Sequence, residues 1–106
     1  MQRLNSHLSL VSTTRASVTV GAIVKLDGEL DCSTERTISR RIAWLVDSAD
    51  AIHIDARGVS FIDAAGLRTL LFAQRRAHES SVELTLAPSG PIKRLVKVFG
   101  LTELFN

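Results

Sequence analysis

Apolar and polar residues alternate along the first part of the chain, which is typical of β-strands. Residues 8–14 (LSLVSTT) and 18–26 (VTVGAIVKL) are rich in β-branched and aliphatic side chains. They predict two strands joined as an antiparallel hairpin that turns near Arg15–Ser17. Asp27 and Gly28 then indicate a turn.

Two further strands are predicted in the second half of the chain. Residues 51–55 (AIHID) form a short strand that is followed by a break at Gly58, and residues 82–87 (VELTLA) alternate cleanly. In the predicted strands one face is apolar and the other polar. The apolar face would hold Val24, Leu26, Ile52, Ile54, Val82, Leu84 and Leu86, and the polar face Lys25, His53, Glu83 and Thr85.

Three segments repeat apolar residues at the spacing of an α-helix. The first covers residues 33–46, with Ser33 or Asp31 as a possible N-cap, and the second covers Ala64–His78 after Asp63. The third begins near Pro91 and carries its apolar residues at i, i+3, i+4 and i+7, before Gly100 ends it. Those residues are Ile92, Leu95, Val96 and Phe99, and a short packed tail, LTELFN, follows.

The predicted order of elements is β-β-α-β-α-β-α, which favours an α/β fold. Each β-α-β unit requires parallel neighbours and a right-handed crossover, whereas the hairpin is antiparallel, so the sheet is mixed. Strands that are covered on both faces read as continuous apolar runs. Because these strands alternate, we expect helices packed mainly on one face of the sheet.

The composition indicates one globular domain over residues 1–106. Apolar residues make up 45% of the chain and charged residues 23%. Cys32 is the only cysteine, which excludes an internal disulfide and fits a reducing compartment. We find neither a signal peptide nor a stretch long enough to cross a bilayer, and we therefore expect a soluble cytoplasmic protein with no direct membrane insertion.

The net charge of +2 is small, but basic residues occur in three pairs: Arg40–Arg41, Arg75–Arg76 and Lys93–Arg94. Phosphate binding by a nucleic-acid surface needs several converging cations. No aromatic platform accompanies these pairs. We therefore interpret them as solvated helix faces and expect no nucleic-acid partner.

The sequence offers little that resembles a catalytic site. His7, His53 and His78 lie on different predicted elements without metal-ligand spacing, and no nucleophile elbow or phosphate-binding loop is present. Several acids fall near predicted strand ends, where a cluster of carboxylates could supply oxygen ligands for a divalent metal: Asp27, Glu29, Asp31, Asp55 and Asp63. We prefer turn and cap roles for them. We expect no enzyme activity, no metal and no cofactor.

Three segments in the same order resemble the STAS domain family (sulfate transporter and anti-sigma factor antagonist). They are residues 26–37 (LDGELDCSTERT), 51–67 (AIHIDARGVSFIDAAGL) and 91–105 (PIKRLVKVFGLTELF). The resemblance extends from about Leu8 to Phe105 and implies a mixed sheet with helices against one face, as the alternation also predicts.

Small stand-alone members of the STAS family resemble bacterial anti-sigma factor antagonists. The resemblance implies that this chain binds an anti-sigma factor, a serine kinase with an ATPase-type fold, and so regulates the availability of a sigma factor for transcription. The usual switch in this family is a phosphorylated serine or threonine directly after the motif aspartate. Asp63 matches that aspartate, and the switch position is Ala64, followed by Ala65. Neither alanine has a hydroxyl, so the resemblance implies a lost phosphosite at Ala64 and a surface that the usual modification cannot switch.

The resemblance also suggests which residues contact the partner. Asp31 matches an acid close to the switch, and Gly66 would allow a partner backbone to approach. Leu67 would begin the buried side of the helix. The expected partner-binding residues are Asp31, Ser33, Thr34, Asp63, Ala64, Ala65, Gly66 and Leu67.

Several alternatives remain open at this point. Ser60, Ser33 and Thr34 are nearby hydroxyls that a kinase could use, although capping and turn roles are preferred. The chain could instead be an accessory STAS scaffold of a transporter ATPase or a sensory complex, or a nucleotide-binding domain. The sequence does not indicate the oligomeric state.

Overall fold

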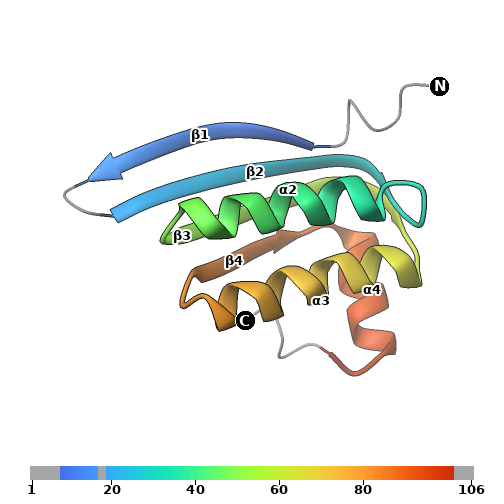
Figure 1. Cartoon of the computed structure of the whole chain (residues 1–106). Helices are drawn as coiled ribbons and strands as arrows, with labels where there is room; N and C mark the ends of the chain where they lie inside the picture. The colour runs from blue at the N-terminus through green and yellow to red at the C-terminus, as the bar shows by residue number, and fades with distance from the viewer. Residues whose placement is uncertain (1–7, 17–18, 102–106) are drawn as a thin grey trace.

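The computed structural model describes residues 8–16 and 19–101, which form a four-stranded sheet and three helices (Figure 1). The strands lie in the order β1-β2-β3-β4. β1 (Leu8–Ala16) pairs antiparallel with β2 (Thr19–Leu30), and β3 (Ala51–Ile62) and β4 (Glu83–Pro88) extend the sheet by parallel pairing. The two β-α-β units are therefore parallel, as predicted. The hairpin turn predicted near Arg15–Ser17 falls partly outside the described residues.

Two helices cover one face of the sheet, and a third lies at one end of the molecule. α2 (Glu35–Ser48) and α3 (Ala64–Glu79) lie side by side in front of the strands in Figure 1, and α4 (Gly90–Val98) follows β4 at the right-hand end. All three predicted helices are confirmed, with shifted ends. Among the described helices none combines the length and the apolar character that crossing a bilayer requires.

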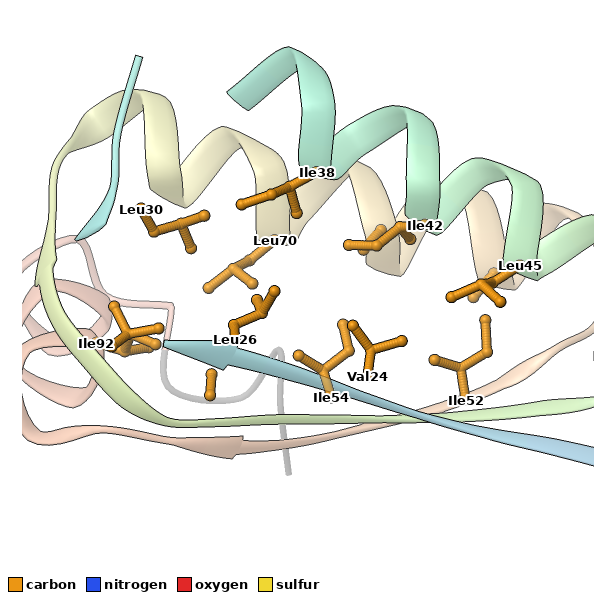
Figure 2. Packing of buried hydrophobic residues seen from close by; sticks show 14 of the residues in the cluster. Val24, Leu26, Leu30, Ile38, Ile42, Leu45, Ile52, Ile54, Leu70 and Ile92 are labelled. Carbon is orange, nitrogen blue, oxygen red and sulfur yellow. The ribbon is translucent and has the colours of Figure 1, made fainter. Parts of the chain in front are cut away.

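The core lies between the sheet and the α2–α3 layer, as Figure 2 shows. Apolar residues of β2 and β3 point into it at every second position, including Val24, Leu26, Ile52 and Ile54. Lys25 and Thr85 are exposed on the other face, where Thr85 Oγ1 is hydrogen-bonded to His53 Nδ1 at 2.7 Å. The prediction that helices cover one face of the sheet is confirmed.

The predicted ends of β2 and β3 were wrong, because both strands continue beyond the expected breaks. β3 runs through Gly58 to Ile62, and β2 passes Asp27 and Gly28 to end at Leu30. The register between the two strands shifts between Lys25 and Asp27 and again between Gly28 and Glu29, so bulges absorb the irregularity. A Cβ at Gly58 would collide with Asp27 Oδ1, so this glycine makes room for a side chain of the neighbouring strand.

The start of α2 and the end of α4 differ from the prediction, whereas Pro91 lies in the first turn of α4 as predicted. The N-cap of α2 is Thr34, whose side chain makes no capping hydrogen bond, and not Ser33 or Asp31. In α4 the N-cap is Ser89, which accepts a hydrogen bond from the N–H of Ile92 at 3.4 Å. Phe99, predicted on the buried side of α4, is the C-cap and is 54% exposed. Gly100 has φ +68°, consistent with its predicted role as a helix end. Of the predicted tail, Leu101 is half-buried and the rest lies outside the described residues.

Candidate functional site

Two connections meet at the end of the sheet where β2 and β3 finish, at the right of Figure 1. They are residues 31–34, between β2 and α2, and Asp63, between β3 and α3. Because the strands are parallel and Leu30 pairs with Ile62, both connections leave the sheet at the same edge. The N–H of Asp63 donates to the Leu30 carbonyl oxygen at 3.4 Å. Two predicted parts of the site are thus brought together.

Asp63 is the N-cap of α3, as predicted. Its backbone is extended, and Oδ1 accepts a hydrogen bond from the N–H of Gly66 at 2.9 Å. This bond satisfies one of the donors that a helix start leaves unpaired. Ala64, the first residue of the helix, is exposed. A small uncharged side chain therefore reaches solvent beside the positive end of the helix dipole.

The next three residues are buried and belong to the packing of α3. Ala65 and Leu67 are each 5% exposed, and Gly66 is also buried. A Cβ at Gly66 would collide with the carbonyl oxygen of Leu30 and lie 2.8 Å from Ile62 Cγ1. The close approach that Gly66 allows is therefore to its own chain, and not to a partner backbone as the sequence suggested.

The loop between β2 and α2 is held by hydrogen bonds of its own. Asp31 Oδ1 accepts from the Ser33 N–H at 3.0 Å and from the Ser33 hydroxyl at 2.6 Å. The Asp31 N–H donates to Thr34 Oγ1 at 3.0 Å, and Thr34 is fully buried. Ser33 is exposed, as is Cys32. Only part of the predicted 31–34 segment therefore faces solvent.

The structure adds two charged residues that the sequence reasoning missed. Arg68, one turn after Ala64, is exposed and pairs with Glu35 at the start of α2, with Nε–Oε2 at 3.1 Å and Nη2–Oε1 at 3.2 Å. These hydrogen bonds raise the pKa of the Arg68 guanidinium, which stays charged. Both residues also line a groove between the two helices, together with Ser39, Leu71, Phe72 and Arg75. The sequence offered one signal for the Arg68–Glu35 pair, namely opposite charges on two predicted helices.

The acids considered as metal ligands do not form a metal site. Among residues 8–16 and 19–101, no three His, Cys, Asp or Glu side chains are grouped so as to hold an ion. Asp55 lies within β3 rather than at a strand end, and Arg57 donates to both of its carboxylate oxygens at 2.8 and 2.9 Å. The Arg57 hydrogen bonds hold the pKa of Asp55 well below its usual range.

Comparison with known proteins gives a consistent result. The family model described as "Mlab, STAS domain" matches residues 13–106.

Three solved structures share the fold. The anti-sigma factor antagonist SpoIIAA of Bacillus, in its unphosphorylated form, is 24% identical, with 88% of this chain and 83% of that chain covered and a TM-score of 0.68. An anti-sigma factor antagonist from Mycobacterium paratuberculosis is 22% identical, with 94% and 84% covered and a TM-score of 0.73. A sulfate transporter family protein from Wolinella succinogenes is 20% identical, with 81% and 71% covered and a TM-score of 0.64. At these identities the likeness establishes the fold alone.

Proposed function

We propose, since this chain belongs to the STAS domain family, that it acts as an anti-sigma factor antagonist that the usual phosphorylation cannot switch. In this proposal it is a bacterial cytoplasmic binding protein without enzyme activity. It would bind an anti-sigma factor with a kinase-type ATPase fold and thereby regulate transcription. The similarity to two anti-sigma factor antagonists supports this choice.

The observation that carries the proposal is the exposure of Ala64 directly after the capping Asp63. A helix N-terminus accommodates a phosphate, because its free N–H groups and its dipole favour negative charge. Phosphate on a hydroxyl at this position would add a charge approaching −2 and repel or desolvate a partner surface. Ala64 has no hydroxyl, so its surface would stay small and uncharged. Ala65 is buried and offers no second position.

The proposed contact surface is the exposed part of the two connections and the first turn of α3. It consists of Cys32, Ser33, Ala64 and Arg68, which we call the Ala64 edge. The Ala64 edge would be held in place by the buried residues that pack behind it, and these would not contact the partner. They are Thr34, Ala65, Gly66 and Leu67. Asp31 and Asp63 would hold its backbone through the hydrogen bonds described above.

The test is a pull-down from the native cytoplasm with the wild-type chain and the Ala64→Ser and Ala64→Glu variants, with bound proteins identified by mass spectrometry. We expect an anti-sigma factor to bind the wild type with and without ATP, and Ala64→Glu to lose it. Ala64→Ser should bind but release the partner when the kinase and ATP are present. Stoichiometric phosphorylation of the wild type that abolishes binding would contradict the proposal.

A matched control separates the Ala64 edge from a general effect of charge. Thr85→Glu adds the same charge at an exposed position on the uncovered face of the sheet. This variant should bind like the wild type. If Ala64→Glu also binds like the wild type, the Ala64 edge is not the contact surface.

A second candidate function is an accessory STAS subunit that scaffolds a transporter ATPase. The similarity to the sulfate transporter family protein favours this candidate. A scaffold also needs no phosphorylatable hydroxyl at the position that Ala64 occupies. Recovery of a transporter ATPase and no anti-sigma factor in the same pull-down would support it. Nucleotide binding by the chain itself is tested by calorimetry with ATP and GTP, for which we expect no heat of binding.

A further inference from the structure

An exposed apolar patch lies where α4 meets the end of β3. Phe61 is 49% exposed, Val98 78% and Phe99 54%, and they make up three of the five large exposed hydrophobic residues in the described part of the chain. Phe61 and Val98 line one open hollow together with Pro91 and Leu95, so the two elements form a continuous surface. Contiguous exposed apolar residues are typical of a protein or membrane contact.

The same helix carries three exposed cations: Lys93, Arg94 and Lys97. α4 contains no acidic residue. Within the residues that the structure describes, none of the three cations takes part in an ion pair. Arg94 also lines the hollow beside Phe61, so positive charge borders the apolar surface directly.

We propose that this α4 patch, made of Phe61, Lys93, Arg94, Lys97, Val98 and Phe99, docks the protein on the surface of an anionic phospholipid bilayer. The apolar side chains would enter the boundary between headgroups and acyl chains, while the cations contact lipid phosphates. Polybasic surfaces are attracted to anionic leaflets in this way, and salt weakens the attraction. The contact is peripheral and does not require a spanning helix.

The aliphatic part of the patch favours a lipid surface over a nucleic acid. The exposed rings of Phe61 and Phe99 suit a base or a lipid equally, whereas Val98, the most exposed apolar residue of the patch, is aliphatic and has no ring on which a base could stack. α4 lies at one end of the molecule in Figure 1. The exposed arginines of α2, in contrast, share their helix with the exposed acid Asp47.

The docking proposal is independent of the partner proposed above, and its test uses the purified chain and defined vesicles. Vesicles of phosphatidylcholine mixed with phosphatidylglycerol in equal parts are compared with phosphatidylcholine alone in a sedimentation assay at low salt. We expect binding to the mixed vesicles only, weakened as salt is raised. Failure of the wild type to sediment with the mixed vesicles at low salt would overturn the proposal.

Two variants with equal changes in charge locate the contact. Lys93→Glu/Arg94→Glu/Lys97→Glu alters the patch, and Arg36→Glu/Arg40→Glu/Arg41→Glu alters exposed cations of α2 by the same amount. The α4 variant should need at least about tenfold more lipid for half-maximal binding, whereas the α2 variant should keep most of its binding. If both variants lose binding equally, net charge alone explains the binding to lipid. If the α2 variant loses more binding than the α4 variant, the contact lies on α2. Either result rejects the α4 patch.

The apolar contribution is tested with Val98→Gln/Phe99→Gln, which changes only exposed side chains and leaves the cations in place. We expect binding to fall several-fold, with an unchanged far-ultraviolet circular dichroism spectrum.

As a direct reporter of insertion, Phe99→Trp in a Trp44→Phe background places the only tryptophan in the patch. Its fluorescence should shift to shorter wavelength on mixed vesicles. Binding without this shift would contradict insertion, and binding of duplex DNA at lower concentration than the lipid would favour the nucleic-acid interpretation.

Discussion

At the scale of single residues, the two alanines that follow Asp63 have different roles. The sequence treats Ala64 and Ala65 alike, as two small residues without a hydroxyl. In the structure Ala64 is exposed and Ala65 is 5% exposed. A modification or a partner can therefore reach Ala64, the position that the resemblance matches to the switch, but not its neighbour Ala65.

Gly66 provides a stability test of the close contact between α3 and β2. We predict that Gly66→Ala lowers the free energy of unfolding by about 1–3 kcal/mol, because the new Cβ must displace the Leu30 carbonyl or move the helix. Urea denaturation measures the change. Gly90→Ala is the matched control, since beyond its chain neighbours the new Cβ meets Arg94 Nη1 alone, at 3.4 Å, and it should change the free energy of unfolding by less than about 1 kcal/mol. A neutral Gly66→Ala would contradict the contact.

A second residue-scale prediction concerns pH. In the folded chain Arg57 lowers the pKa of Asp55, so the pair stabilises the fold above the ordinary aspartate pKa of about 3.9, and this contribution is lost as the pH falls below it. The stability difference between wild type and Arg57→Gln should therefore be constant above about pH 5 and shrink below about pH 4. Denaturation at a series of pH values measures it.

The control for this pH prediction is the same substitution in an Asp55→Asn background. There Arg57→Gln should change stability equally at every pH, because the titrating carboxylate is gone. A difference between wild type and Arg57→Gln that grows as the pH falls would have the wrong sign for the ion pair seen in the structure.

At the scale of elements, periodicity predicted all three helices and the buried face of the sheet. It failed at the ends of β2 and β3, because Gly28 and Gly58 look like breaks in a single sequence. The space that Gly58 leaves is filled by Asp27 from the neighbouring strand. Such a contact depends on strand register, which the pattern of one strand does not contain.

α4 allows an element-scale prediction, because two residues predicted on its apolar side are buried as expected. Its buried residues are Ile92 and Val96, while Val98 is 78% exposed. We predict that Ile92→Ala lowers the free energy of unfolding by about 2–5 kcal/mol, because it leaves a cavity in the core. Val98→Ala should stay within about 0.5 kcal/mol of the wild type. Guanidinium denaturation compares the two, and equal effects would show that α4 is packed differently.

At the scale of the whole molecule, the candidate site is assembled from connections that only the parallel pairing of β2 and β3 brings together. Asp63 and Ala64 were found from the sequence because they are adjacent in one motif. Arg68 and Glu35 were not, because their ion pair joins residues 33 positions apart on two helices. Local chemistry was thus predictable, whereas the surface around it depends on how α2 and α3 pack.

Because the Ala64 edge lies outside the core, recognition and folding should be separable in the intact protein. Ala64→Glu places a carboxylate in the first turn of α3, where the helix dipole favours it but the neighbouring Asp63 repels it. We predict that the free energy of unfolding changes by less than about 1 kcal/mol, while binding to the partner recovered with the wild type is lost. Thermal unfolding and a binding titration on the same preparation measure both quantities. If Ala64→Glu loses partner binding and its unfolding temperature also falls by several degrees, the loss of binding is explained by the damaged fold. The Ala64 edge would then no longer explain recognition.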